Sequence, residues 1–245
     1  MTTQTTDKAY KLLALQENIS NRTAKELIDR GIVYAAGKKI LLARLDVKTN
    51  TVFKIEKLKK PQILFEDDNI TAVDKPPFLT AEEISQSFKL TLLHRLDKET
   101  SGVLLLSKNE EFTKKVIDVF KNRKVEKIYL AIVNGKFIEP MNIDTPLKII
   151  KTKSGAFAKP SKDGQTAIST VTPKLIDGKN SIVEVSIQTG RTHQIRAHLK
   201  SVGFPVIGDE KYGGRPSSRI MLHAWKISLL GYNFESPIPS EFRLS

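Results

Sequence analysis

The sequence predicts an α+β protein of two domains, residues 1–60 and 61–245. Strand-like segments outnumber helical ones along the chain, which favours a largely antiparallel sheet. With 245 residues, the chain is long enough for one sizeable domain and a small one. Basic charge is concentrated at the start, because residues 1–60 hold 13 Lys and Arg against 6 acidic residues. Lys59–Lys60–Pro61 would form the linker.

The first domain is expected to contain one helix followed by a hairpin. Residues 21–30 have helical spacing of apolar residues, with Ser20 or Thr23 as the cap at the start. Gly31 follows the last turn, where a left-handed cap is expected. Short strands are predicted in 32–40 and 51–58, with turn signals at Gly37 and Thr49–Asn50.

This helix, turn and hairpin unit resembles the small S-four-type RNA-binding domain over about residues 12–58. Basic side chains surround it, and the resemblance implies that Lys25, Arg30, Lys38 and Lys39 contact RNA. The sequence departs from that family at Ala35–Ala36, where a polar residue usually precedes the glycine. The alternative is a basic helical hairpin that only packs on the larger domain.

The second domain begins with a strand, an acidic turn and a strand in 63–77, ended by Pro76–Pro77. The apolar run 103–107 is a candidate for a buried strand. Residues 111–123 are predicted to be a helix that directs Phe112, Val116, Ile117 and Phe120 inward. Further strands are predicted at 128–133, 169–176, 181–187 and 221–229, with a helix in 192–203 that ends at Gly203.

Composition narrows the function classes. A net charge of +13 indicates a polyanionic partner. The absence of cysteine excludes disulfides, thiolate zinc sites and cysteine nucleophiles. The sequence contains no stretch of about 18 apolar residues, so no membrane span is predicted. Met1–Ala9 lacks the apolar core of a signal peptide. We therefore expect a cytoplasmic protein, and a monomeric one.

The segment His94–Gly102 (HRLDKETSG) precedes the candidate buried strand, on a loop at a sheet edge where function is often located. Asp97 lies between Arg95 and Lys98 in this segment. By itself such an aspartate is commonly part of a surface salt bridge, and Thr100–Ser101–Gly102 is consistent with a plain turn.

Several further segments, in order along the chain, favour a functional role for Asp97 over a surface salt bridge. After HRLDKETSG come KIYLAIVNG (127–135), TGRTHQIRAHL (189–199), GFPVIGDEKYGG (203–214) and MLHA (221–224), with ILFEDDNITAVDKPP (63–77) ahead of them. Together they resemble the RluA-type pseudouridine synthases over about residues 61–240. The resemblance implies a core with a central mixed, mainly antiparallel sheet, and the isomerisation of uridine to pseudouridine in structured RNA.

The resemblance also implies residue roles. Asp97 would attack the flipped uridine, and Arg196 would pair with Asp97. Tyr129 would lie against the uracil and help to take the proton from C5, and Arg95 would fill the space left by the flipped base. His94 and Arg191 would contact RNA. Two alternatives stay open, that Arg191 is the partner of Asp97 and that Tyr129 is only a core residue; so does whether the carboxylate attacks the sugar or the base first.

These residue types suit the chemistry. The isomerisation changes no oxidation state, so we expect no cofactor, no metal and no bound nucleotide. A carboxylate in a dry pocket needs a cation to offset desolvation, and arginine keeps its charge at any ordinary pH. Extruding a base costs a few kcal/mol, and stacking on an aromatic ring returns about 1–3 kcal/mol.

Rival functions are less well supported. His193 and His198 are five residues apart and on different helix faces, so a zinc site is not expected. A two-carboxylate N-glycosidase would need a second acid, for which Glu99 is nearest in sequence. A non-catalytic RNA-binding ribosome-assembly factor would fit the basic first domain equally well. We predict large-subunit (23S) ribosomal RNA as the substrate, because family members with an S-four-type domain mostly modify it, with transfer RNA as the alternative.

Overall fold

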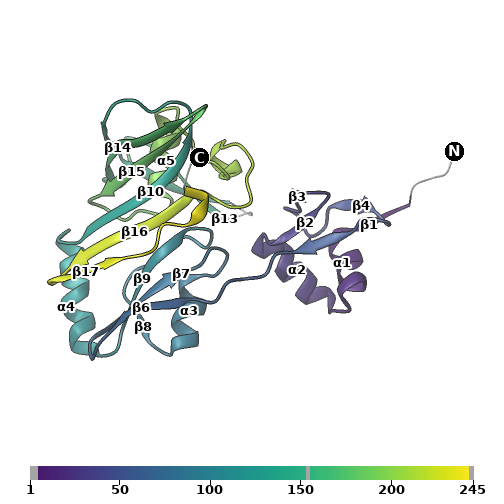
Figure 1. Cartoon of the computed structure of the whole chain (residues 1–245), viewed down its shortest axis with the longest axis horizontal. Coiled ribbons are helices and arrows are strands. Elements are labelled where there is room, and N and C mark those ends of the chain that lie inside the picture. The colour runs from purple at the N-terminus through teal and green to yellow at the C-terminus, as the bar shows by residue number, and fades with distance from the viewer. Residues whose placement is uncertain (1–4, 153–154, 243–245) are drawn as a thin grey trace. The chain divides into compact units, whose positions relative to one another are not determined.

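The computed structural model describes residues 5–152 and 155–242, and it divides into two compact units, Met1–Lys59 and Lys60–Ser245 (Figure 1). Each unit has its own hydrophobic core. In the described part of the chain, no helix is long and apolar enough to cross a bilayer.

The small unit contains two helices and two small sheets. Its elements are β1 (Thr6–Lys8), α1 (Ala9–Glu17), α2 (Asn21–Arg30), β2 (Val33–Ala35), β3 (Lys38–Lys39), β4 (Asp46–Lys48) and β5 (Phe53–Ile55). Strand β2 pairs with β3 and β5, and β1 pairs with β4, all antiparallel. The predicted helix and hairpin are present, whereas β1 and α1, which open the unit, and β4 were not predicted.

The ends of α2 follow from local chemistry. The Ser20 hydroxyl accepts a hydrogen bond from the Thr23 backbone N–H at 3.0 Å, so Ser20 is the cap and Thr23 lies inside the helix. Gly31 ends the helix at φ 82°, a left-handed conformation that glycine adopts without strain. The hairpin turn uses Ala36 and Gly37, both at positive φ.

The large unit is built on a ten-stranded sheet with the order β11-β14-β15-β10-β16-β9-β7-β6, to which β8 and β17 are added. Of the pairings described in this sheet, β9 with β16 is parallel and the others are antiparallel. This confirms the predicted central mixed, mainly antiparallel sheet. The strands are β6 (Gln62–Glu66), β7 (Ile70–Lys75), β8 (Thr91–Leu92), β9 (Ser101–Ser107), β10 (Glu126–Asn134), β11 (Met141–Asp144), β14 (Ile168–Asp177), β15 (Asn180–Ile187), β16 (Leu222–Leu229) and β17 (Tyr232–Glu235).

Helices cover both faces of this sheet. Alternate residues of β9 divide between two core clusters, with Leu104 and Leu106 in one and Val103 and Leu105 in the other. The first cluster includes residues of α3 (Ala81–Phe88) and α5 (Gln194–Ser201), and the second includes residues of α4 (Glu110–Lys121). Because β9 is covered on both sides, its sequence is a continuous apolar run. The prediction for Ile117 is wrong, since its side chain lies on the solvent face of α4 and is 57% exposed.

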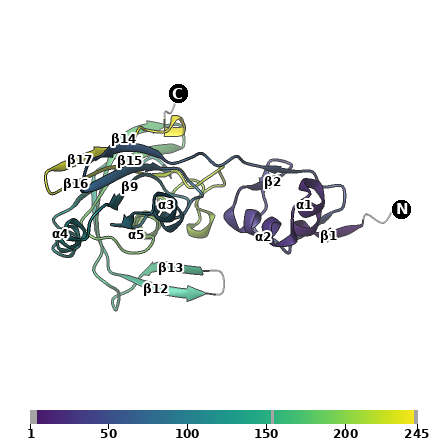
Figure 2. The same ribbon diagram turned by 90° about the horizontal axis from the view of Figure 1, so that it is seen from below.

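A separate two-stranded ribbon formed by β12 (Leu147–Thr152) and β13 (Gly155–Pro160) stands apart from the main sheet (Figure 2). The backbone N–H of Ala158 in this ribbon donates to the Tyr212 hydroxyl at 2.7 Å. Tyr212 ends the short 3-10 helix η1 (Glu210–Tyr212), and a second such helix, η2 (Ser240–Phe242), lies near the end of the chain. Together with α3, β8, β11 and β17, the ribbon was not predicted from the sequence.

Candidate active site

The loop that carries Asp97 runs into β9, an interior strand between β7 and β16. The loop therefore precedes a buried strand, as predicted, and lies at the end of a central strand. Backbone bonds fix it in place, with the Thr100 N–H donating to the Asp97 carbonyl at 3.0 Å and the Phe78 N–H donating to the Lys98 carbonyl at 2.8 Å.

Lys75 lies beneath this loop with no solvent exposure. Its ammonium donates to the carbonyl oxygens of Pro76 and Lys98, both at 2.9 Å. Burial is the main cause that lowers the pKa of Lys75 to about 7, and the charge of Asp97 opposes the shift. Lys75 therefore anchors the loop from inside the protein.

Gly102 lets β9 approach β16 closely. Its φ is 114°, and a Cβ at this position would lie 2.1 Å from the Ala224 carbonyl oxygen. The parallel pairing of β9 and β16 includes Gly102 opposite Ala224. A side chain larger than hydrogen would therefore push apart the two strands that position the Asp97 loop.

Arg196 connects two carboxylates. Its Nη1 donates to Asp97 Oδ2 at 3.0 Å, while Nε and Nη2 donate to the two oxygens of Asp209 at 2.6 and 2.9 Å. Arg196 and Asp209 are 6% and 1% exposed, whereas the Asp97 side chain is 27% exposed. Although burial lowers the pKa of Arg196, the hydrogen bonds and charges of the two aspartates outweigh it and raise the pKa, so the guanidinium stays charged.

The fork on Arg196 explains how a partly exposed carboxylate can be held still. Asp209 takes the bidentate position and is buried, so it fixes the plane of the guanidinium. Asp97 takes the third nitrogen of the guanidinium, Nη1, through one of its two oxygens. Asp209 was not predicted as a site residue, although it lies in the GFPVIGDEKYGG segment.

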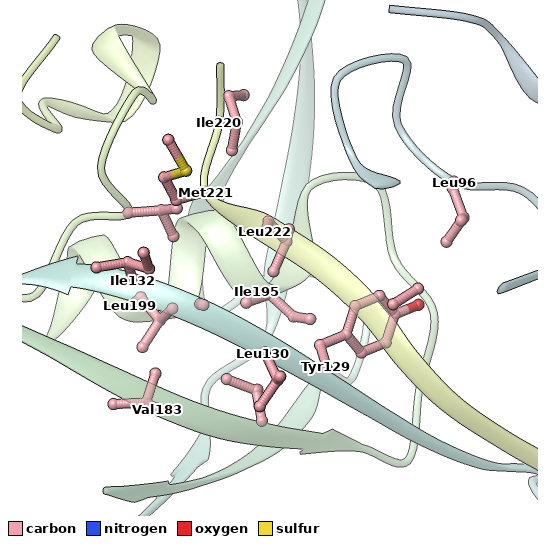
Figure 3. Packing of buried hydrophobic residues seen from close by; sticks show 14 of the residues in the cluster. Leu96, Tyr129, Leu130, Ile132, Val183, Ile195, Leu199, Ile220, Met221 and Leu222 are labelled. Carbon is pink, nitrogen blue, oxygen red and sulfur yellow. The ribbon is translucent and has the colours of Figure 1, made fainter. Parts of the chain in front are cut away.

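Tyr129 is buried on β10 with 9% exposure and belongs to the same cluster as Leu96, Ile195 and Leu222. Figure 3 shows this packing from close by. Burial, and then the charge of Asp97, raises the pKa of Tyr129. The phenol therefore stays protonated near neutral pH.

His193 is a further residue beside Asp97, with its Nε2 at 3.7 Å from Asp97 Oδ2. Its Nδ1 lies 3.1 Å from the Tyr212 hydroxyl. That hydroxyl oxygen accepts the Ala158 N–H, and its own proton can point to Nδ1; in that arrangement the imidazole carries its proton on Nε2, facing Asp97. Burial is the main cause that lowers the pKa of His193. From the sequence, His193 was considered only as a metal ligand, and its position beside Asp97 was not predicted.

The backbone of His193 has φ 53° and ψ 24°, a left-handed conformation unusual for a residue with a side chain. Residues held this way cluster at functional sites, where the surrounding structure compensates for the strain. Here Gln194 supplies part of that support, because its side-chain oxygen accepts from both the Thr189 hydroxyl and the Arg191 N–H.

The other residues predicted to contact RNA from this domain, Arg95, Arg191 and His94, have protein partners other than Asp97. Arg95 is 77% exposed and pairs with Glu82 at 2.8 Å. Arg191 donates through Nε to the Thr166 carbonyl and does not pair with Asp97. His94 Nε2 accepts the Leu105 N–H at 3.2 Å, and burial lowers its pKa to about 4, so the ring is neutral and anchors the loop to β9.

The predicted contacts of the first domain all belong to the small unit. Lys25 lies over the Tyr10 ring at 4.3 Å, Arg30 ends α2, and Lys38 and Lys39 form β3.

Two adjoining pockets open at this site. The first, of about 90 Å³, is lined by residues that include Asp97, Tyr129, His193 and Arg196. The second, of about 550 Å³, shares part of the first pocket's wall. Among the described residues, no cluster of three or more His, Asp or Glu side chains is arranged to hold a metal ion.

The chain is similar to a known protein family and to several of its members. Residues 58–201 match the family model described as RNA pseudouridylate synthase. A Helicobacter pylori (strain J99) protein named as an uncharacterized RNA pseudouridine synthase is 52% identical over 242 residues, covering 97% of this chain and 100% of the relative.

The names of some more distant relatives specify the RNA substrate. A Rickettsia felis protein named ribosomal large subunit pseudouridine synthase C is 35% identical, covering 77% of this chain and 69% of its own length. A Haemophilus ducreyi protein named tRNA pseudouridine synthase C is 34% identical, with coverage of 66% and 82%.

The structure named Human RNA Pseudouridylate Synthase Domain Containing 1 superposes with a TM-score of 0.65 at 25% identity, covering 75% of this chain and 84% of that one. The family model covers more than half of the chain, and the Helicobacter pylori relative extends over nearly all of it. The chain therefore belongs to the RNA pseudouridylate synthase family, whose members are isomerases.

Proposed function

We propose that this chain isomerises uridine in large-subunit ribosomal RNA and that Asp97 is the nucleophile. The observation that carries the assignment is the charged fork Asp97–Arg196–Asp209 at the mouth of a small pocket. A carboxylate that holds one oxygen on a buried guanidinium can direct the other at a ligand. That geometry fits attack on a nucleotide that has been extruded from its stack.

Tyr129 and Arg95 would act on the two sides of the extruded nucleotide. The Tyr129 ring lines the pocket beside Asp97 and would contact the uracil as a neutral phenol. The exposed guanidinium of Arg95 would leave Glu82 and stack into the space that the base vacates, since it is flat and lies at the rim.

The small unit would dock on the same RNA. It carries much of the basic excess, and its folded helix and hairpin present Lys25, Arg30, Lys38 and Lys39. Docking of this kind depends on phosphate contacts, so affinity would fall steeply as salt rises. Removal of residues 1–58 should weaken RNA binding and leave slow catalysis; full activity of that truncation at physiological salt would contradict the docking role.

The substrate assignment rests on relatives rather than on the pocket. The Rickettsia felis relative is named for the large ribosomal subunit, and the Haemophilus ducreyi relative, named for transfer RNA, supplies the alternative. Mapping of pseudouridines in both RNA classes from a deletion strain would decide between them. Loss of a modification only from transfer RNA would overturn the ribosomal assignment.

The catalytic assignment is tested by tritium release from RNA labelled at uracil C5. Wild-type protein should release tritium, and Asp97→Asn should bind RNA but release none. Glu99→Gln is the matched control, because it removes a carboxylate two residues away in the same loop. Tight binding without release by the wild type would instead indicate an RNA-binding assembly factor.

A further inference from the structure

The larger pocket beside Asp97 has an unusual charge pattern. Among the described residues that line it are five cationic side chains and no acidic one; the cations are Arg95, Lys121, Arg123, Lys127 and Arg191. We refer to this cavity as the Lys127 pocket. Arginine and lysine offer only hydrogen-bond donors, so an occupant rich in acceptor oxygens and negative charge would match the wall.

Lys127 is the most constrained of these cations. It is 9% exposed, and in the described part of the chain its Nζ has one oxygen in hydrogen-bond range, the Thr189 carbonyl at 3.4 Å. Lys75, the other buried lysine, has two carbonyls at 2.9 Å. An ammonium has three protons to donate, so Lys127 keeps donor capacity inside the protein that an anion would use.

Burial and then the charge of Arg191 lower the pKa of Lys127 to about 8. The free protein thus holds a weakened ammonium at neutral pH. A bound anion would favour the charged form and reverse this shift. The pKa agrees with the geometry, since both describe a cation without its counter-charge.

The Lys127 pocket directly adjoins the smaller pocket of about 90 Å³, which is lined by Asp97 and is called the Asp97 pocket below. Tyr129, Gly190 and Arg191 line both cavities. Lys127 and Tyr129 are two residues apart on β10, so their side chains emerge on the same face of the strand. The Lys127 Nζ lies 3.7 Å from the position of a Cβ on Gly190, a residue that lines both cavities.

We propose that the Lys127 pocket binds a phosphate of the RNA backbone next to the uridine whose base occupies the Asp97 pocket. The inference rests on the proposed function, since it takes the uridine as the occupant of the smaller pocket. Lys127 holds the phosphate from inside, and Arg123 and Arg191 neutralise it from the walls. The nucleotide is then bound at two points. Its base occupies the Asp97 pocket and its backbone phosphate occupies the Lys127 pocket.

The test compares uridine 3′,5′-bisphosphate with uridine as ligands of the full-length protein, by calorimetry or by competition with RNA. Wild type should bind the bisphosphate more tightly. Lys127→Met should lower that preference about ten- to a hundredfold, the size expected for hydrogen bonds to a charged group. Lys127→Arg, which keeps the charge, should retain much of the preference.

Lys115→Met is the matched control, because it removes the same charge from an exposed position on α4 paired with Glu111. It should leave the preference unchanged. Equal binding of uridine and bisphosphate by the wild type would overturn the proposal, and so would an unchanged preference in Lys127→Met with a native melting curve. Neither result depends on tritium release, so this proposal and the proposed function fail separately.

The pH dependence gives a second readout. Bisphosphate affinity of the wild type should fall as pH rises from 7 to 9, because Lys127 loses its proton near pH 8. The other charged or titratable groups that line this pocket are Arg95, Lys121, Arg123, Arg191, His94 and Tyr129. The arginines keep their charge, His94 is already neutral, and burial raises the pKa of Tyr129, so its phenol stays protonated. Lys121→Met should preserve the pH dependence and Lys127→Arg should abolish it. The same fall in Lys127→Arg would contradict the assignment to Lys127.

Discussion

Asp209 is the residue whose removal tests the site most sharply, because Arg196 connects it to the Asp97 carboxylate. Asp209→Asn replaces an acceptor oxygen with an amide that donates toward the guanidinium. The change leaves a charge that is 6% exposed with Asp97 as its remaining carboxylate partner. Breaking a buried pair by removing one partner costs about 3–5 kcal/mol.

That cost translates into a measurable melting shift. For a domain of this size, 1 kcal/mol corresponds to about 2–4 °C in the melting temperature, so the transition of the large unit should fall by roughly 6–20 °C. Activity should fall as well, because Arg196 loses the bidentate contact that fixes its plane. The loss should appear in kcat more than in KM, since the Asp97 pocket itself is unchanged.

The assay is calorimetric melting together with tritium release at saturating RNA. Glu210→Gln is the matched control, since it removes an exposed carboxylate from the neighbouring position and should change neither quantity. If Asp209→Asn melts like the wild type and keeps its kcat, Arg196 is not held by Asp209, and the reasoning fails.

A double variant separates stability from positioning. Arg196→Met with Asp209→Leu replaces the buried pair by apolar side chains, an exchange that is often neutral for stability. The double variant should therefore recover much of the melting temperature lost in Asp209→Asn. It should not recover activity, because Asp97 has then lost its cation. Recovery of activity would show that Asp97 works without that pair.

Three further predictions concern the groups around Asp97. Tyr212→Phe removes the hydroxyl that is hydrogen-bonded to His193 Nδ1. Nitrogen-15 chemical shifts of His193 should then show the imidazole proton moving toward Nδ1, and kcat should fall at unchanged RNA affinity. An unaltered tautomer would refute the hydrogen-bond assignment. Gly102→Ala should lower the melting temperature strongly, because a Cβ would overlap the Ala224 carbonyl at 2.1 Å, whereas native melting would show that the strands can separate. Lys75 has a pKa of about 7 in the folded protein against 10.5 unfolded, so the unfolded chain binds more protons between these values and stability rises with pH there. This rise, up to about 1.4 kcal/mol per pH unit, should be missing in Lys75→Met, and urea unfolding at pH 7.5 and 9.5 measures it.

Local pattern predicted much of the fold in advance. The continuous apolar run of β9, the helical spacing in α4 and α5, and the Ser20 and Gly31 signals around α2 all act over a few residues, so they can be read along the chain. Helix α3 was missed although it carries a local signal. Thr80 and Glu83 form a capping box, with both reciprocal hydrogen bonds present. The short strands β8, β11 and β17 have no comparable signal, because two to four residues cannot show a period.

The family resemblance, the basic charge and the residue types of the Asp97 loop can be read from the amino-acid order alone. Which side chains meet depends on how the chain folds. Arg196 and Asp97 are 99 residues apart, and their contact depends on the parallel register of β9 with β16 and on the placement of α5. The partnership of Arg196 with Asp209, the contact of His193 with Tyr212 and the burial of Lys127 arise the same way. Such contacts follow from packing and burial, which a one-dimensional pattern does not encode.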